Sequence, residues 1–164
     1  MGAITTLAAR VTIGGGFTNA LDLSTPIDTL NLITSKVFSN GTGADQVNQP
    51  WHDQRTLTAT SENLDLAGSL VDAFGDTIAF TAVKVLLVHN RSTTTTEDLT
   101  LSGSFLDNDM LGGGSSTVVL GPDGVFYITS PVDGFTVTAA TGDVLTIDSG
   151  AATITYDIIL AGTV

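Results

Sequence analysis

The chain has 164 residues, no cysteine and a formal charge of −12, from 17 acidic and 5 basic side chains. The lack of cysteine excludes disulfides, thiolate metal sites and cysteine nucleophiles. The scarcity of Lys and Arg argues against binding to nucleic acid or to an acidic membrane surface, and we expect neither as a partner. The length suits one domain with an additional arm.

Residues 1–40 are apolar but irregular in pattern. Pro26 could start a helix that runs to Phe38. The apolar residues between them do not keep a period of 3.6, so strands are favoured over a helix. A Ser-Asn-Gly-Thr-Gly run at residues 39–43 then breaks the pattern. We predict that residues 1–40 form an N-terminal arm used for assembly or oligomerisation.

Residues 41–54 are predicted to be a linker, and "GADQVNQPWHDQR" is the densest polar run of the chain. Pro50 lacks an N–H and keeps its neighbour extended. Trp51 and Arg55 are of the types that dominate interface hot spots. Together with Phe38, which closes the apolar N-terminal run, they are our candidate interface residues. An alternative with equal weight is that Trp51 plugs one end of the domain locally.

Residues 55–164 alternate between apolar and polar positions, with Gly and Asp turns every 8–12 residues. This spacing predicts an all-β antiparallel sandwich, and about eight strands suit a jelly roll. Residues 77–90 are apolar on both faces and indicate a central strand, in which Lys84 is expected near a rim. Gly121 to Gly124 match a type I turn. Five phenylalanines at strand positions are expected in the core: Phe74, Phe80, Phe105, Phe126 and Phe135.

Catalytic patterns are weak. His52 and His89 are the only candidate bases, and no GxSxG motif accompanies them. Asp107 and Asp109 begin like a calcium loop that lacks its remaining ligands, so a turn is favoured. The glycine triplets at 14–16 and 112–114 do not match a phosphate-binding loop. We predict no catalytic residue, no cofactor and no metal.

Several longer motifs, by contrast, form a recognisable series. They are "GTGADQ…WHDQRTL…LDLAGSL.DAFG", the "VKVLLV" strand, the "GPDGVF" turn and the final "GDVLTID…ITYDIIL" segment. From about Asn40 to Gly162 the chain resembles small structural proteins encoded among the head and tail genes of tailed bacteriophages. The resemblance implies a β-rich protein that decorates a capsid or forms a spike or fibre.

The functional prediction is therefore a non-enzymatic virion protein, most simply a capsid decoration or cement protein on the capsid surface. We expect a homo-oligomer, with a trimer favoured because sandwich decoration proteins commonly form trimers. The major capsid protein or other virion proteins are the expected partners. The alternative is a spike, fibre or tail component whose sandwich binds a host glycan, with Tyr127 or Trp51 as the sugar platform. A carbohydrate-active enzyme is the third and weakest hypothesis.

Overall fold

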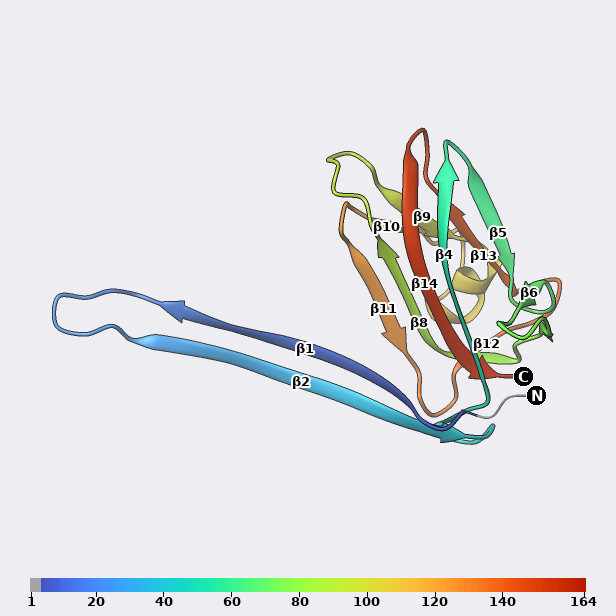
Figure 1. Ribbon diagram of the computed structural model, residues 1–164, viewed down its shortest axis with the longest axis horizontal. Helices are drawn as coiled ribbons and strands as arrows, with labels where there is room; N and C mark the ends of the chain where they lie inside the picture. The colour runs from blue at the N-terminus through green and yellow to red at the C-terminus, as the bar shows by residue number, and fades with distance from the viewer. Residues whose placement is uncertain (1–3) are drawn as a thin grey trace.

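The computed structural model describes residues 4–164 and shows an antiparallel β-sandwich from which a long hairpin projects (Figure 1). The predicted fold class, an all-β sandwich with an extended N-terminal arm, is thus confirmed. Residues 1–3 of the predicted arm lie outside the described residues. Within residues 4–164, no helix is long and apolar enough to cross a membrane.

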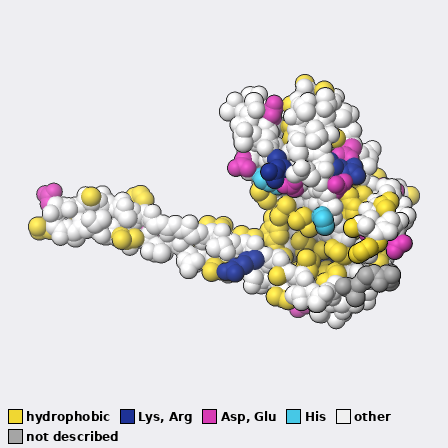
Figure 2. Space-filling view, viewed as in Figure 1, with side chains coloured by type: hydrophobic (Ala, Val, Ile, Leu, Met, Phe, Trp, Pro, Cys, Tyr) yellow, Lys and Arg dark blue, Asp and Glu magenta, His cyan; other side chains and the backbone are white. Residues whose placement is uncertain are grey.

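The arm is a two-stranded antiparallel hairpin. Strand β1 (Leu7–Thr18) pairs with β2 (Ile27–Asn40) along its full length, from Leu7 opposite Phe38 to Thr18 opposite Ile27. Residues 19–26 form the loop at the tip. Pro26, which lacks an N–H, comes directly before β2 and ends the loop rather than starting a helix. The arm extends sideways, well clear of the sandwich (Figures 1 and 2).

Two sheets make up the sandwich. The sheet next to the arm, here the arm-side sheet, has the order β11-β8-β14-β4, and the short β12 also pairs with β8. Its strands are β4 (Gln49–Thr58), β8 (Ala82–Asn90), β11 (Val125–Thr129), β12 (Phe135–Thr136) and β14 (Thr153–Thr163). The far sheet has the order β10-β9-β13-β5. Its strands are β5 (Ser61–Asp65), β9 (Leu99–Ser102), β10 (Val118–Leu120) and β13 (Val144–Asp148).

Pairing in the sandwich is nested. Early strands pair with late ones in reverse order: β4 with β14, β5 with β13, β8 with β11, and β9 with β10, all antiparallel. The sandwich is therefore one long double strand folded over on itself. This pattern is compatible with the predicted jelly roll, and what the structure establishes is the antiparallel sandwich.

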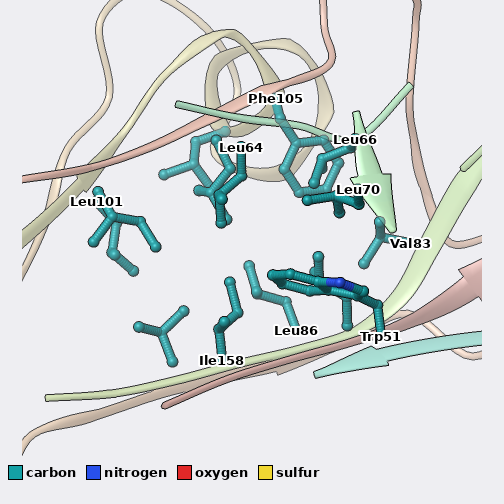
Figure 3. Packing of buried hydrophobic residues seen from close by; sticks show 14 of the residues in the cluster. Trp51, Leu64, Leu66, Leu70, Val83, Leu86, Leu101, Phe105 and Ile158 are labelled. Atoms are coloured by element: carbon teal, nitrogen blue, oxygen red, sulfur yellow. The ribbon is translucent and has the colours of Figure 1, made fainter. Parts of the chain in front are cut away.

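Apolar side chains from both sheets meet between them (Figure 3). In β14 the alternate residues Ile154, Tyr156, Ile158 and Leu160 are fully buried, because successive side chains of a strand point to opposite faces. Trp51, Leu64, Leu86 and Leu101 face one another across the core, as Figure 3 shows. Three smaller elements also contribute side chains to this core: β6 (Leu70–Val71), β7 (Thr77–Ile78) and the π-helical turn η1 (Leu106–Met110). The short β3 (Gln46–Val47) instead belongs to a second, smaller cluster through Val47.

The predicted linker is largely part of the fold. Strand β3 runs parallel to the end of β2, and β4 starts at Gln49. Only residues 41–45 and Asn48 therefore lie outside strands in the range 41–54. The reason is that β4 is the edge strand of its sheet, where the missing N–H of Pro50 does not interrupt the pairing with β14. The sandwich thus begins before residue 55.

A β-bulge explains why Lys84 is buried rather than near a rim. The register of β14 on β8 jumps from Ala161 opposite Val85 to Gly162 opposite Val83, so Lys84 is the extra residue. Its side chain is 2% exposed. Its Nζ donates hydrogen bonds to the carbonyl oxygens of Gly43 at 2.6 Å and Val132 at 3.3 Å. Lys84 therefore fastens the base of the arm to the sandwich.

Two smaller expectations are wrong. Phe74 is 83% exposed, because it lies in the loop between β6 and β7 rather than in a strand, whereas Phe80 and Phe105 are in the core as predicted. The turn at Gly121 to Gly124 has the expected hydrogen bond, but Asp123 has φ 58°. A positive φ at the third turn position is typical of type II rather than type I.

Candidate functional site

The strand register divides the arm into two faces. Residues directly opposite each other in an antiparallel pair point to the same side. One side, here the apolar face of the arm, carries these residues: Leu7, Ala9, Val11, Ile13, Phe17, Leu30, Leu32 and Phe38. The opposite side is richer in polar and glycine residues, among them Arg10, Thr12, Gly14, Asn31 and Ser35. The separation is partial, because the apolar face also carries Asp28, Thr34 and Lys36, and the opposite side also carries the exposed Ile27, Ile33 and Val37. The arm is therefore moderately amphipathic, with most of its apolar residues on one side.

The apolar face is buried only at its root. Ala9 and Phe38 pack with Val47, Val85 and Ala161 in a small second core. Further out the same face is uncovered, with Ile13 51%, Phe17 75%, Leu30 59% and Leu32 55% exposed. Leu23 in the tip loop is 99% exposed. The arm thus presents a continuous line of large apolar side chains to solvent.

A groove opens where the arm leaves the sandwich, and we call it the crook. It has a volume of about 680 Å³ and lies between residues 7–12 of β1 and the outer surface of the arm-side sheet. The sheet contributes Val85, Leu87, Val125, Tyr127 and Ile159. Figure 2 shows hydrophobic side chains gathered on this face, next to the root of the arm. Val125 is 54% and Ile159 41% exposed, so part of the crook is uncovered.

Charged groups border the crook further along the same sheet. Arg91 donates a hydrogen bond to Asp157 at 2.8 Å, and His89 lies 3.0 Å from Asp123 and 3.8 Å from Asp157. The hydrogen bond from Arg91, aided by one from Gln54, lowers the pKa of Asp157. These four groups lie beside the crook and are not among the residues that line it, which are mostly apolar.

The charge of the molecule is distributed very unevenly. Residues 1–40 contain two acids, Asp22 and Asp28, and two bases, Arg10 and Lys36, so their net charge is zero. The remaining residues therefore carry the whole charge of −12. Within the arm, both bases lie near the root and both acids lie toward the tip, so an acidic surface repels the arm less than it repels the sandwich.

The predicted interface residues lie mostly inside the chain. Phe38 is fully buried in the second core, where it fixes the root of the arm. Trp51 is 5% exposed and belongs to the main core, and its indole N–H donates to the carbonyl oxygen of Val71 at 3.1 Å. Both residues thus act as internal anchors in the single chain, and the local plug is the interpretation that fits Trp51. The alternation of β4 explains this, since it turns Trp51 and Leu57 inward together.

Arg55, the third candidate, joins a polar network at the rim of the sandwich. Its guanidinium pairs with Asp53 at 2.9 Å and with Glu62, and it lies over the Trp51 ring with its Cζ 5.7 Å from the ring centroid. Glu62 also accepts a hydrogen bond from the Tyr156 hydroxyl at 2.6 Å. Burial, together with that hydrogen bond, raises the pKa of Tyr156. The network joins β4, β5 and β14 across the two sheets.

The residues that the sequence suggested as candidate bases or calcium ligands show no arrangement typical of either role among the described residues. His52 is exposed on the outer side of β4, and no Asp or Glu carboxylate lies within 4.0 Å of it among the described residues. Asp107 accepts a hydrogen bond from the backbone N–H of Ser116, and Asp109 accepts one from Thr136 at 2.7 Å. Within residues 4–164, no cluster of three potential metal ligands is found.

A second groove, of about 620 Å³, lies on the other side of the arm's root. It is lined by residues 4–7, 48–53 and 71–74, including the exposed Phe74. Trp51 is one of its lining residues, but it is almost fully buried and its N–H donates to Val71, so little of the ring is available to a sugar. Tyr127, the other suggested platform, is half-buried in the crook.

No protein-family model, no curated protein and no solved structure matches the chain. The candidate functional site therefore rests on geometry alone. That geometry consists of an uncovered apolar face on the arm and an uncovered apolar crook at its root. The sequence named the arm but not the crook, whose residues come from β1, β8, β11 and β14 and converge only in the folded chain.

Proposed function

We propose that this chain is a non-enzymatic structural protein that assembles through its arm, and that it serves as a capsid decoration or cement protein on a tailed-bacteriophage virion. The observation that carries the proposal is the exposed apolar face of the arm. The virion assignment is supported by the resemblance of residues 40–162 to phage head and tail proteins.

An isolated two-stranded hairpin is marginally stable at best in water. In the part of the chain that the structure describes, β3 is the one further strand on the arm, and it pairs only with residues 39 and 40 of β2. Most of the arm is therefore not packed against any described residue outside it, while large apolar residues line it. Exposed apolar surface of this extent marks a binding site in monomeric proteins. A partner that covers the arm supplies the missing packing.

An exposed apolar arm is well suited to assembly on a shell that repeats the same binding site many times. Each arm contributes a small contact, and many copies acting together give a large total affinity. The acidic sandwich then faces solvent and keeps the particle surface soluble. In this proposal the protein forms a homo-oligomer, with a trimer favoured, and its partners are its own copies and the major capsid protein.

The test is co-sedimentation of the purified protein with empty capsids of the same particle. A short-arm variant, in which residues 13–32 are replaced by Asn-Gly, provides the comparison. It keeps Leu7, Ala9 and Phe38, so the root and the sandwich stay packed. We expect the full-length protein to sediment with capsids and the short-arm variant to stay in solution. Equal binding by both would show that the arm is not the assembly element.

The second candidate function is a spike, fibre or tail component that binds a host glycan. One observation favours it: Tyr127 lies in an open groove, where an aromatic ring can contact a sugar. The test is a glycan array with wild-type protein and a Tyr127→Ala variant. Binding that is lost in the variant favours this function over capsid decoration.

A further inference from the structure

We infer that the crook of one copy receives the arm of a second copy of this chain. The inference rests on the proposed assembly role of the arm and names the partner surface. Both surfaces are uncovered in the single chain, and both are apolar. Each copy would give one arm and receive one, which closes a ring of two copies in a dimer or of three in the favoured trimer.

The root of the arm provides the first argument. There the apolar face already packs on the outer surface of the arm-side sheet, through Ala9 and Phe38 against Val85 and Ala161. Val125 and Ile159 continue the sheet side of this contact, and Ile13, Leu30 and Leu32 continue the arm side. Neither continuation is covered by any of residues 4–164, because the arm extends away from the sheet (Figure 2). A second arm can extend the same contact with the same residue types.

Charge provides the second argument. The sandwiches of two copies each carry −12 and repel one another, whereas residues 1–40 are neutral as a whole. Both bases of the arm, Arg10 and Lys36, lie near its root, and its two acids, Asp22 and Asp28, lie toward the tip. The arm is thus the part of the chain that another copy repels least. The crook is lined mostly by apolar side chains, together with Arg10, and the nearby carboxylate of Asp157 is paired with Arg91. The free part of the arm fits this lining, because it is mostly apolar and its two acids have the charge opposite to that of Arg10.

The size of the contact provides the third argument. The free part of the arm, from Val11 to the tip, is roughly 35 Å long and 10 Å wide at the usual strand rise and spacing. One arm therefore offers about 350 Å², and each contact that covers its whole free face buries about 700 Å² from both sides. The two contacts of one copy, one as donor and one as receiver, then bury about 1,400 Å², within the range of stable interfaces. A single arm on an unrelated surface would bury half of that.

The glycine triplet at residues 14–16 agrees with close approach of another chain. None of the three has a positive φ, and a side chain at Gly15 would meet nothing within 4 Å. The single chain thus gives no reason for glycine, which weakens a strand interior. Glycine in a strand often marks a place where another backbone comes close.

Sedimentation equilibrium of paired variants tests the inference without capsids. On the arm, Leu30→Asp places a charge on the apolar face, and its control Asn31→Asp places the same charge at the next residue, on the opposite face. On the sandwich, Val125→Asp changes a residue of the crook, and its control Val119→Asp changes a residue of the far sheet. The two valines are similarly exposed, Val119 at 59% and Val125 at 54%. All four sites are exposed, so each variant is expected to fold, as circular dichroism would check.

We expect an oligomeric wild-type protein, and dissociation constants at least about tenfold higher for Leu30→Asp and Val125→Asp, from the loss of one buried apolar side chain each. The two control variants should associate like the wild type. A monomeric wild-type protein would overturn the inference. So would dissociation by Leu30→Asp with no effect of Val125→Asp, which would mean that the arm binds elsewhere.

The cysteine-free sequence allows a second, independent test. Val125→Cys protein is mixed with single-cysteine variants on the apolar face (Ile13→Cys, Leu30→Cys, Leu32→Cys) or on the opposite face (Thr12→Cys, Asn31→Cys). Mild oxidation should give several-fold more disulfide-linked heterodimer with the apolar-face set. Equal yields would overturn the inference.

Failure of the inference is separable from failure of the proposed function. A wild-type monomer that still sediments with capsids in an arm-dependent way would refute arm exchange and leave capsid decoration intact. An oligomer that obeys the variant pattern but ignores capsids would support arm exchange and refute decoration.

Discussion

Replacing Trp51 with Ala should destabilise the fold of the single chain. The side chain is 5% exposed, packs in the main core and donates its N–H to Val71. Truncation of a buried Trp costs about 3–5 kcal/mol, which includes the cavity that is left. For a chain of this length that corresponds to a fall in Tm of roughly 8 to 16 °C. A protein of ordinary stability, about 5–15 kcal/mol, can lose most of its margin.

Urea unfolding followed by circular dichroism measures this loss, since the variant has no Trp fluorescence. The Trp51→Phe variant is the control: it keeps most of the apolar volume and loses the hydrogen bond, so about 1–2 kcal/mol is expected. If Trp51→Ala unfolds at the wild-type urea concentration but no longer associates, the internal-plug account is refuted and Trp51 belongs to an interface.

Three further predictions follow from the packing. Gly162→Ala should lower the free energy of unfolding by about 1–3 kcal/mol, because its methyl group would collide with the neighbouring strand at the bulge. The control Gly15→Ala, which lies in open space, should leave the unfolding free energy of the sandwich unchanged. Equal effects of the two variants in thermal unfolding would argue against the bulge. Lys84→Ala should cost about 1–3 kcal/mol by leaving two carbonyl groups without a donor, and should make residues 41–45 more sensitive to limited proteolysis than in the wild type. Arg91 lowers the pKa of Asp157 below its unfolded value of about 3.9, so this pair stabilises the fold above that pH and its contribution is lost as the pH falls through the lowered pKa. In the Asp157→Asn variant the Tm should therefore fall less steeply below about pH 4. A Tm profile identical to that of the wild type would contradict the coupling.

Much of the fold could be predicted because alternation is a local signal. β14 shows it clearly: Ile154, Tyr156 and Ile158 are all fully buried, on the face that the sequence pattern indicates. Strand pairing cannot be derived in the same way. It joins residues as distant as Trp51 and Leu160, and no local pattern specifies such partners.

Lys84 and Trp51 show where local patterns fail. The bulge at Lys84 depends on the register of two strands, so the sequence of one strand cannot reveal it. Trp51 stands in a polar run, "NQPWHDQR", which suggested a surface. Strand β4 instead turns Trp51 inward, and Arg55 pairs with both Asp53 and Glu62 at the rim. The polar neighbours of Trp51 thus suggested a surface position for a residue that lies in the core.

The sequence predicted one part of the candidate site, the arm, but not the other part, the crook. An apolar N-terminal segment ahead of a regular sandwich indicated an arm, and the hairpin bears this out structurally. The crook depends on four strands that meet in space, with Val125 and Ile159 left uncovered by the arm's own direction. That direction is set by the buried root at Phe38 and by the Lys84 contacts, which are tertiary features.

The most direct test of the account is the sedimentation mass of the purified chain and of the short-arm variant, each alone and with empty capsids. The account predicts an oligomer that joins capsids for the full chain, and a folded monomer that does not join them for the variant. A full chain that stays monomeric and ignores capsids would contradict the central claim that the arm exists for assembly.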